Sequence, residues 1–453
     1  MRKLLLASAA TMGALLVTVG GAQAQPVTPV APGTIAVHLN GYLQYGIGYF
    51  GSSANTVTTA AGTSKLNPYN TAGDARLYAG FDAQTLNGIE YGTQIELRTT
   101  TSDANTAAGK KTGIGGSAGT ESFYVKRAYG YIGAAQAGFV RLGQTDSAFS
   151  LMQSGVIEAF GDGQQFNADG AMFTSIPSGA TPTNFVYADT SGLYATDKIV
   201  YLSPTIAGFS MGVGFEPNSD GLKEGTASCT NAASTGGTGN SACNDIASSP
   251  LENATFRRNT IDAAVMYVGT FGGFANKVSV GILNSAPTED TAAGAEKFRG
   301  MTAYQAGAQT GFAGFTLGAN VKWGSLRDSY AFKPAGARDA LGYIVGGTYT
   351  IGPWVVGTSF FDEQSAGNDV PLAAGVAPGT ATTGVARTLT EYGVAAGGNY
   401  VIGKDLSLYL QYMYGHEHQP GFNFTAAAAN STTPGGSGNA QFQTIATGAT
   451  YKW

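Results

Sequence analysis

The chain has 453 residues, of which 67 are glycine and only 12% are charged, against about 25% charged residues in an average soluble domain. Hydrophobic residues make up 43% of the sequence, but past the N-terminus they form no run of the roughly 18 residues that a membrane-spanning helix needs. The 23 Tyr, 23 Phe and 3 Trp residues argue against disorder, and the net charge of −5 without a basic cluster argues against nucleic-acid binding.

Residues 1–24 have the features of a secretory signal peptide. Arg2 and Lys3 precede an apolar stretch from Leu4 to Val19, and Ala22-Gln23-Ala24 fits the small-x-small cleavage pattern. An uncleaved N-terminal anchor is the alternative. Loss of Arg2 and Lys3 would reduce the 24 basic residues to 22, against 29 acidic ones, so the exported chain would carry a net charge of −7.

The mature chain is dominated by segments of about ten residues in which apolar residues alternate with small or polar ones. In the first segment, Val37, Leu39 and Leu43 alternate with polar residues such as His38 and Asn40. This two-residue period predicts β-strands with one apolar face. Sixteen strands are predicted, at 35–50, 74–84, 89–98, 123–133, 139–147, 196–203, 209–216, 259–268, 274–283, 301–310, 315–323, 340–351, 354–361, 389–402, 406–415 and 441–453.

The connections between these segments alternate between short turns and long polar loops. Seven short turns are expected near 86–88, 134–138, 204–208, 269–273, 311–314, 352–353 and 403–405. Eight long loops are expected near 51–73, 100–122, 148–195, 217–258, 284–300, 324–339, 362–388 and 416–440. This count is the one that sixteen antiparallel strands require if both ends of the chain lie on the same side.

The composition of the two strand faces distinguishes a membrane barrel from a soluble sandwich or propeller, which could use the same alternation. The polar face is rich in Gly, Asn, Gln and Thr rather than in the dense Lys and Glu of a solvated surface. Aromatic residues lie near strand ends on the apolar face, as in interfacial girdles: Tyr45, Tyr49, Trp323, Trp354, Tyr400, Tyr414, Tyr451 and Trp453. The sequence therefore predicts an apolar exterior around a polar interior.

The final strand bears on barrel closure, because in hydrocarbon every backbone N–H and C=O must be paired and no sheet edge can remain. Alternation continues through Tyr451 to Trp453 at the carboxyl end, so we expect the last strand to pair with the strand at 35–50. The segment at 123–133 is ambiguous, because Val125 and Tyr129 share a parity with Arg127; its facing is left open.

Four motifs resemble the trimeric general porins of Gram-negative bacteria, in particular those of alphaproteobacterial type. They are DARLYAGF at 74–81 leading to Asn87-Gly88, RAYGYIG at 127–133, GFVRLGQ at 138–144 and YLSPTIAGFS at 201–210. Gln144 stands where the family frequently has a basic residue, and Trp453 where a terminal Phe is commoner. The resemblance covers nearly all of 25–453, the predicted barrel domain. It implies an all-β, sixteen-stranded antiparallel transmembrane barrel in the outer membrane, with short periplasmic turns and long extracellular loops, assembled as a homotrimer.

The resemblance also implies an inward-folded third long loop, which here is the connection at 148–195. This loop carries Glu158, Asp162 and Asp169 in a glycine-punctuated stretch. Opposite it we expect a basic wall made of Arg76, Arg98, Arg127 and Arg141. Acidic and basic walls would create a transverse field at the narrowest point, so the predicted function is passive diffusion of small hydrophilic solutes and ions through a charged constriction. The net charge of −7 suggests a weak cation preference.

Several alternatives remain open. Each arginine could pair with a neighbouring carboxylate, as Arg98 with Glu96, only to satisfy a buried charge. A substrate-selective channel, for example for sugars, would need an aromatic ladder, and Tyr42, Tyr78 and Tyr409 lie at polar-parity positions. An outer-membrane enzyme would need a catalytic triad with His38, His416 or His418. An adhesin could use the long loops. We expect no enzyme and no cofactor, with membrane lipids, solutes and ions as partners.

Two local features complete the prediction. Cys229 and Cys243 are the only cysteines, and in an oxidising compartment we expect them to form a disulfide. His416-Glu417-His418 lacks a third strong ligand, and we expect it to be a solvated loop segment rather than a metal site.

Overall fold

The computed structural model describes residues 30–53, 55–59, 62–65, 67–99, 123–166, 196–219, 257–287, 298–327, 330–371, 384–422, 424 and 438–453. Its elements are β1 (Ile35–Ser52), β2 (Thr56–Thr59), β3 (Gly62–Lys65), β4 (Tyr69–Gln84), β5 (Glu90–Thr99), β6 (Phe123–Ala134), β7 (Gly138–Thr145), α2 (Ala148–Leu151), β8 (Thr196–Leu202), β9 (Phe209–Asn218), β10 (Arg257–Phe271), β11 (Phe274–Pro287), β12 (Met301–Phe312), β13 (Phe315–Ser325), β14 (Ala340–Ile351), β15 (Trp354–Pro371), β16 (Gly384–Gly403), β17 (Leu406–His418) and β18 (Asn439–Lys452). No helix within these ranges is long and apolar enough to cross a membrane.

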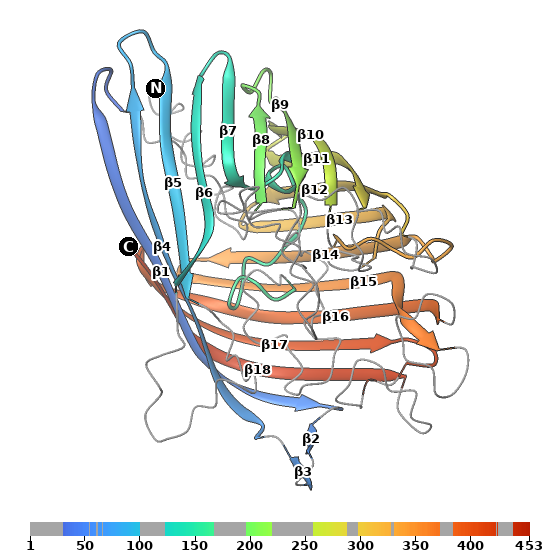
Figure 1. Cartoon of the computed structure of the whole chain (residues 1–453). Helices are drawn as coiled ribbons and strands as arrows, with labels where there is room; N and C mark the ends of the chain where they lie inside the picture. The colour runs from blue at the N-terminus through green and yellow to red at the C-terminus, as the bar shows by residue number, and fades with distance from the viewer. Residues whose placement is uncertain are drawn as a thin grey trace.

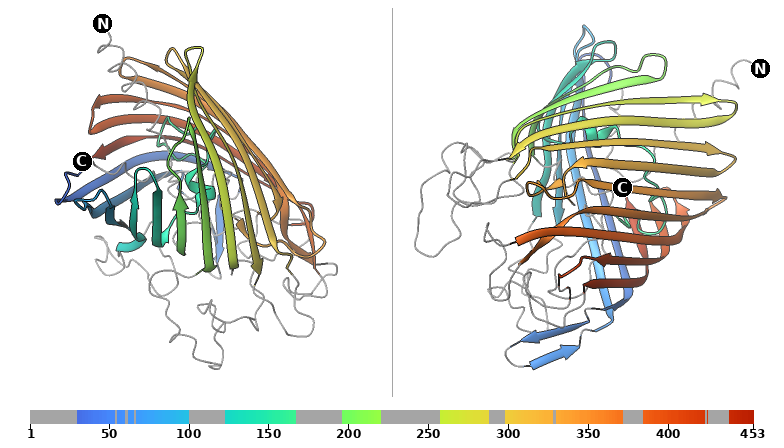
Figure 2. Two further views of the ribbon diagram at one scale, coloured as in Figure 1. Left: turned by 90° about the horizontal axis from the view of Figure 1, so that it is seen from above. Right: turned by 90° about the vertical axis from the view of Figure 1, so that its right-hand side faces the viewer.

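Sixteen of the strands in the described ranges form one closed antiparallel barrel (Figures 1 and 2). Each strand pairs with its neighbours in the chain, and β1 pairs with β18 to close the ring. At the closure, the backbone N–H of Gly41 donates to Trp453 at 3.1 Å and the N–H of Trp453 donates to Gly41 at 3.2 Å. The predicted fold and the predicted pairing of the last strand with the first are confirmed.

The barrel exposes its apolar residues and turns its polar residues inward. On β1, Val37 and Leu39 are 81% and 62% exposed on the outside, whereas Gln44 on the opposite face is only 1% exposed. The same outward exposure recurs on later strands, for example at Leu317 and Leu410. Because successive side chains of a strand point to opposite faces, the two-residue period of the sequence translates directly into a lipid-compatible exterior.

Aromatic side chains pair across neighbouring strands near the short turns. Phe315 and Tyr349 have ring centroids 4.3 Å apart, and the centroids of Trp354 and Tyr400 lie 4.7 Å apart. Such pairs contribute about 0.5–1.5 kcal/mol beyond the area that they bury. Their position at one rim of the barrel is that of an aromatic girdle at the membrane interface.

Several strands are longer than the apolar alternation predicts. β4 begins at Tyr69, β15 continues to Pro371 and β17 continues to His418. The connection predicted at 51–73 contains the two-stranded hairpin β2–β3, which projects beyond one end of the barrel in Figure 1. Backbone pairing needs no apolar side chains, so strands continue past the lipid-facing band, where alternation of hydrophobicity no longer marks them.

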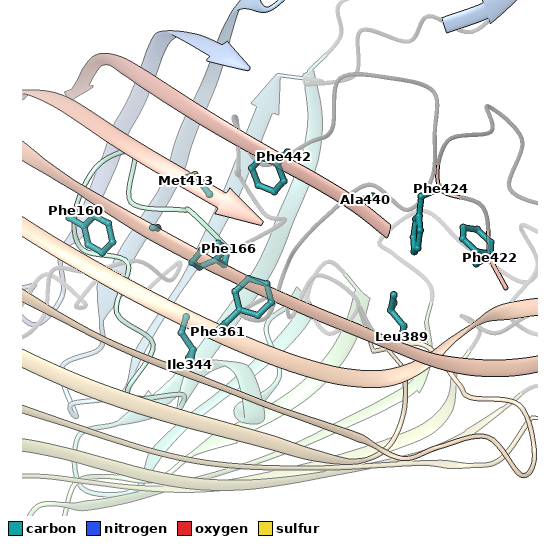
Figure 3. Packing of buried hydrophobic residues seen from close by; sticks show 11 residues of the cluster. Phe160, Phe166, Ile344, Phe361, Leu389, Met413, Phe422, Phe424, Ala440 and Phe442 are labelled. Carbon is teal, nitrogen blue, oxygen red and sulfur yellow. The ribbon is translucent and has the colours of Figure 1, made fainter. Parts of the chain in front are cut away.

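The interior also holds apolar clusters, which the alternation does not predict. The larger one, shown in Figure 3, joins loop residues Phe160 and Phe166 to inward-facing strand residues such as Ile344, Phe361 and Met413. Phe166 and Phe361 meet edge to face with centroids 4.7 Å apart, and both are fully buried. A second cluster surrounds Phe149 and includes Leu283 and Met301. Apolar residues on the inner wall are thus covered by chain that folds into the barrel.

Candidate functional site

Four arginines gather on the inner wall of the adjacent strands β4, β5, β6 and β7. Arg76 of β4 lies directly opposite Arg98 of β5, and Arg127 of β6 lies opposite Glu96 of β5. Arg141 of β7 lies opposite Tyr131 of β6. Each of the four arginines is less than a tenth exposed. We call this arc of the barrel, lined by Arg76, Arg98, Arg127 and Arg141, the arginine wall.

Three of these arginines are paired with carboxylates. Arg76 contacts Asp74 on its own strand, with an N–O distance of 2.5 Å. Arg98 contacts Glu96 at 2.5 Å, so the pairing considered as an alternative from the sequence exists. Arg127 donates two hydrogen bonds to Asp146, both 2.8 Å long, and also contacts Glu96. Charged hydrogen bonds of this bidentate kind hold the guanidinium plane in a defined orientation.

Arg141 differs from the other three. Its guanidinium carbon lies 5.1 Å from the centroid of the Tyr129 ring, an arrangement in which the cation is attracted to the aromatic face. Within the described part of the chain, its side chain makes no ion pair and no hydrogen bond. Of the four arginines, Arg141 is thus the one without a carboxylate partner in the described part of the chain.

A β-bulge decides which way the β6 side chains face. The register shifts by one residue where Glu96 pairs with Arg127 while Leu97 pairs with Val125, so Lys126 has no opposite residue. A bulge of this kind reverses the alternation of the strand. Val125 is accordingly 37% exposed on the outside and Arg127 is 6% exposed on the inside. Val125 and Arg127 are two residues apart and would face the same side of a regular strand, but the bulge places Val125 on the outside and Arg127 on the inside.

Gln144 helps to hold the bulge instead of extending the arginine wall. Its amide nitrogen lies 3.3 Å from the carbonyl oxygen of Val125 and 2.9 Å from that of Lys126. Gln144 occupies the parity of β7 opposite to that of Arg141.

The chain that follows β7 runs along the inside of the barrel (Figure 1, teal). Ser147 is the N-cap of helix α2, and its hydroxyl accepts a hydrogen bond from the N–H of Ser150 at 3.2 Å. The N–H of Phe149 donates to Asp262 of β10 at 2.8 Å, and its carbonyl accepts from Gln305 of β12 at 2.5 Å. The sequence does not predict this helix, which is a single capped turn.

The middle of this segment lies against β11, β12 and β13. The hydroxyls of Ser154 and Ser279 are 2.8 Å apart, and Asn320 donates to the carbonyl of Ser154 at 2.9 Å. Gly155 has φ +84°, and a Cβ placed there would lie 1.9 Å from the carbonyl oxygen of Ala319. Only glycine can bring the loop backbone this close to the wall.

The end of the segment reaches the other side of the ring. Asn399 of β16 donates to the carbonyl of Gly161 at 2.7 Å, and Gln44 of β1 donates to the carbonyl of Asp162 at 2.9 Å. Gln164 accepts a hydrogen bond from Arg76 of β4 at 2.9 Å. The described part of the loop, up to Phe166, is thus attached to the inner wall from β10 around to β4, where it meets the first residue of the arginine wall.

Glu158 and Asp162 belong to this inward-folded loop, where both side chains are buried. Asp162 accepts a hydrogen bond from Gln411 of β17 at 2.8 Å, and Glu158 accepts one from the N–H of Phe166 at 2.7 Å. Asp162 is 5% exposed and Glu158 is 1% exposed, and neither forms an ion pair with an arginine of the arginine wall. Asp169, the third predicted acid, lies outside the described residues.

Burial also changes the acidity of these two carboxyl groups. It raises the pKa of Glu158 to about 8, an effect that the hydrogen bond from Phe166 opposes only in part. Burial likewise raises the pKa of Asp162 to about 6. Oε2 of Glu158 is buried and has no hydrogen-bond partner within the described ranges. The geometry therefore favours a protonated Glu158 at neutral pH.

The predicted aromatic positions divide into two groups. Tyr42 lies on β1 beside the arginine wall, and the guanidinium of Arg76 is 5.2 Å from its ring centroid; Tyr78 follows Arg76 on the same face of β4. Tyr409 lies on β17 and is 2% exposed. The structure does not bring Tyr409 together with the other two.

Sequence reasoning missed a second charged network and two acids of the arginine wall, Asp74 and Asp146. Glu216 of β9 contacts Lys198 of β8 at 2.9 Å and Arg257 of β10 at 3.0 Å, and all three are buried. Lys198 and Glu216 occupy inward parity on predicted strands, which is the signal that could have found them. Asp146, the partner of Arg127, directly follows β7.

The other predicted features are the histidine pair, the cysteine pair and the signal peptide. His416 and His418 lie within β17, so the expectation of a solvated loop there is wrong, because the strand pairing with β18 continues through both residues. Within the described residues no group of three or more His, Cys, Asp or Glu side chains is close enough to hold a metal ion. Cys229, Cys243 and residues 1–24 lie outside the described ranges.

An apolar exterior, a closed ring of sixteen strands and a charge-lined interior define the class of transmembrane β-barrel channels. The chain belongs to the Gram-negative porin family, whose profile matches residues 7–420. It is therefore a multi-pass β-barrel protein of the outer membrane.

The fold of this chain is similar to that of several solved structures. The anion-selective porin from Comamonas acidovorans matches with a TM-score of 0.52 and 15% identity, over 93% of this chain and 100% of that one. The trimer form of OmpT from Vibrio cholerae matches with a TM-score of 0.48 and 10% identity, over 92% and 99%. Salmonella typhi OmpF in complex with daunomycin matches with a TM-score of 0.48 and 13% identity, over 92% and 97%. None of the curated proteins matches this chain.

Proposed function

We propose that this outer-membrane channel allows passive diffusion of small hydrophilic solutes and ions, without a catalytic step or a cofactor. The proposed constriction lies between the loop from Asp146 to Phe166 and the arginine wall. The observation that carries the proposal is the path of that loop, which is hydrogen bonded to the inner wall from β10 to β4. A sixteen-stranded barrel is too wide for its own wall side chains to fill, so an inward loop reduces its cross-section without closing it.

The roles proposed for the predicted site residues follow from their surroundings. Arg76, Arg98, Arg127 and Arg141 supply the charge of the constriction, whereas Asp162 holds the loop against β17 and Glu158 is buried within the loop. A role for Asp169 in the constriction stays a prediction. Arg141, which has no carboxylate partner within the described residues, supports a weak anion preference, because charges at the narrowest point outweigh a net charge of −7 spread over the chain.

Transport of a specific sugar is the second candidate. Tyr42 and Tyr78 beside Arg76 favour it, because aromatic faces next to polar side chains suit carbohydrate rings. A continuous ladder would need further exposed aromatics along one path, and Tyr409 is buried on another strand. General diffusion therefore remains the preferred function.

We also propose a homotrimer in contact with outer-membrane lipids, a cleaved signal peptide at 1–24 and a Cys229–Cys243 disulfide. Family membership supports the trimer and the export signal. The apolar exterior supports both lipid contact and subunit contact.

Reconstitution of the purified protein into planar bilayers tests the proposed function. We expect stepwise conductance, typically in groups of three steps, with a reversal potential in a KCl gradient that indicates a small anion preference. A folded and inserted preparation without conductance would contradict the porin function. A channel that conducts a single sugar and excludes ions would favour the second candidate.

A further inference from the structure

The Arg141 side chain combines burial with the absence of a counter-charge. It is 8% exposed, and within the described residues no carboxylate contacts it. Leaving a largely desolvated cation unpaired is costly, since the attraction that would compensate its lost hydration is missing. The neighbouring inward cation, Lys198 on β8, is by contrast 2.9 Å from Glu216.

The guanidinium nitrogens of Arg141 remain accessible to water. None of them is among the buried polar atoms that lack a hydrogen-bond partner, and the side chain makes no hydrogen bond within the described ranges. Its nitrogens are therefore at least partly exposed. With 8% of the residue exposed, these N–H groups are the polar part of Arg141 that a solute can reach.

Tyr129 fixes how those N–H groups are presented. Its ring lies under the guanidinium at 5.1 Å, and its own hydroxyl donates to Gln94 at 2.8 Å, so the ring is held at both ends. A guanidinium lying over an aromatic face keeps its N–H groups free at the edge of its plane. The paired N–H groups at that edge match the two oxygens of a carboxylate.

We propose that Arg141, supported by Tyr129, is a binding station for the carboxylate group of small organic anions that pass through the channel. Arg76, Arg98 and Arg127 already have carboxylate partners in the wall, so Arg141 is the position at which a solute supplies the missing negative charge. The station binds weakly, because a solute that is to be transported must also leave. This inference rests on the proposed function and adds a solute class to it.

The test compares ion currents through the full-length protein in planar bilayers, in potassium acetate and in potassium chloride at rising concentration. For the wild type we expect the acetate current to saturate while the chloride current continues to rise. Arg141→Gln should raise the half-saturating acetate concentration about tenfold, which corresponds to loss of one charged hydrogen-bonding contact. Arg141→Lys should give an intermediate value, because an ammonium keeps the charge but cannot offer two parallel N–H groups.

Lys277→Gln is the matched control. Lys277 lies on β11 on the inward face, in line with Ser279, and its substitution removes the same unit of charge outside the arginine wall. We expect this variant to saturate like the wild type. Equal changes in Lys277→Gln and Arg141→Gln would overturn the site, and so would a wild-type acetate current without saturation.

A third arm uses inorganic phosphate in place of acetate. Saturation by phosphate at the same or lower concentration would overturn the assignment to carboxylates, and weaker saturation by phosphate would support it. A preparation that conducts no ion at all contradicts the proposed function itself, whereas a conducting channel without acetate saturation contradicts only the station at Arg141.

Discussion

Glu96 of β5 lies directly opposite Arg127 of the neighbouring strand β6 and forms an ion pair with it. Glu96 also forms an ion pair with Arg98, two residues along its own strand. One buried carboxylate, 1% exposed, therefore holds two guanidinium groups in the arginine wall. The arrangement depends on the bulge at Lys126, because without it Arg127 would point to the lipid. The bulge in β6 therefore decides whether the charge of Arg127 lies inside the barrel.

Replacement of Glu96 by Gln should both destabilise the barrel and increase its anion preference. Removing one partner of a buried ion pair leaves the other charge uncompensated and costs about 3–5 kcal/mol. We expect a lower free energy of unfolding in urea and a reversal potential shifted toward anions. Glu90→Gln is the control, since Glu90 lies on the same face of β5 at the other end of the strand. Similar destabilisation in both variants would contradict the shared role of Glu96.

Stability of the inward loop should fall as the pH rises. Burial raises the pKa of Glu158 from its ordinary value of 4.5 to about 8, so the folded loop favours the protonated form. This stabilising contribution is complete below a pH of 4.5 and is lost as the pH rises through 8. We expect faster proteolysis of the loop at high pH than at low pH. Glu158→Gln, which cannot ionise, should remove most of that difference, while Asp405→Asn in an exposed turn should leave it unchanged.

The close contact of Gly155 with the wall predicts an effect on conductance. In Gly155→Ala, the added Cβ would meet the carbonyl of Ala319, so the loop must move away from β13. We expect single-channel conductance to change by more than the scatter between wild-type channels. Gly336→Ala imposes a similar φ of +86° with no atom within 4 Å of the new Cβ, so it controls for backbone strain alone. An unchanged conductance in Gly155→Ala would show that the loop contact does not set the pore size.

Deletion of Lys126 should prevent assembly of the barrel. Without the extra residue, either Phe123 and Val125 turn into the lumen or Arg127, Tyr129 and Tyr131 turn toward lipid. We expect no form of the protein that resists detergent and migrates as a folded barrel in unheated gels. Lys126→Ala retains the bulge and should fold normally. Normal folding of the deletion variant would show that the facing of β6 is not set at this residue.

The strands and the direction in which they face were predictable because both depend on local alternation. Val37 and Leu39 could be assigned to the exterior from their neighbours alone, since a strand has a period of two and lipid requires apolar contacts. The positions of Arg76 and Arg98 on the inner face followed in the same way. Bulges do not follow this period, and for that reason the facing of Val125 and Arg127 could not be read from the sequence.

The alternating sequence by itself determined sixteen antiparallel strands, a closed ring, an apolar exterior and the set of charged residues available to the interior. Only the tertiary structure decided how those charges are paired, because pairing depends on contacts between residues far apart in the chain. It placed Asp146 against Arg127, bound Asp162 to Gln411 of the covered wall, buried Glu158 within the loop and left Arg141 over Tyr129 with no carboxylate partner among the described residues. Strand periodicity is a property of neighbouring residues, whereas a charge balance inside a barrel depends on register, bulges and the path of an inward loop.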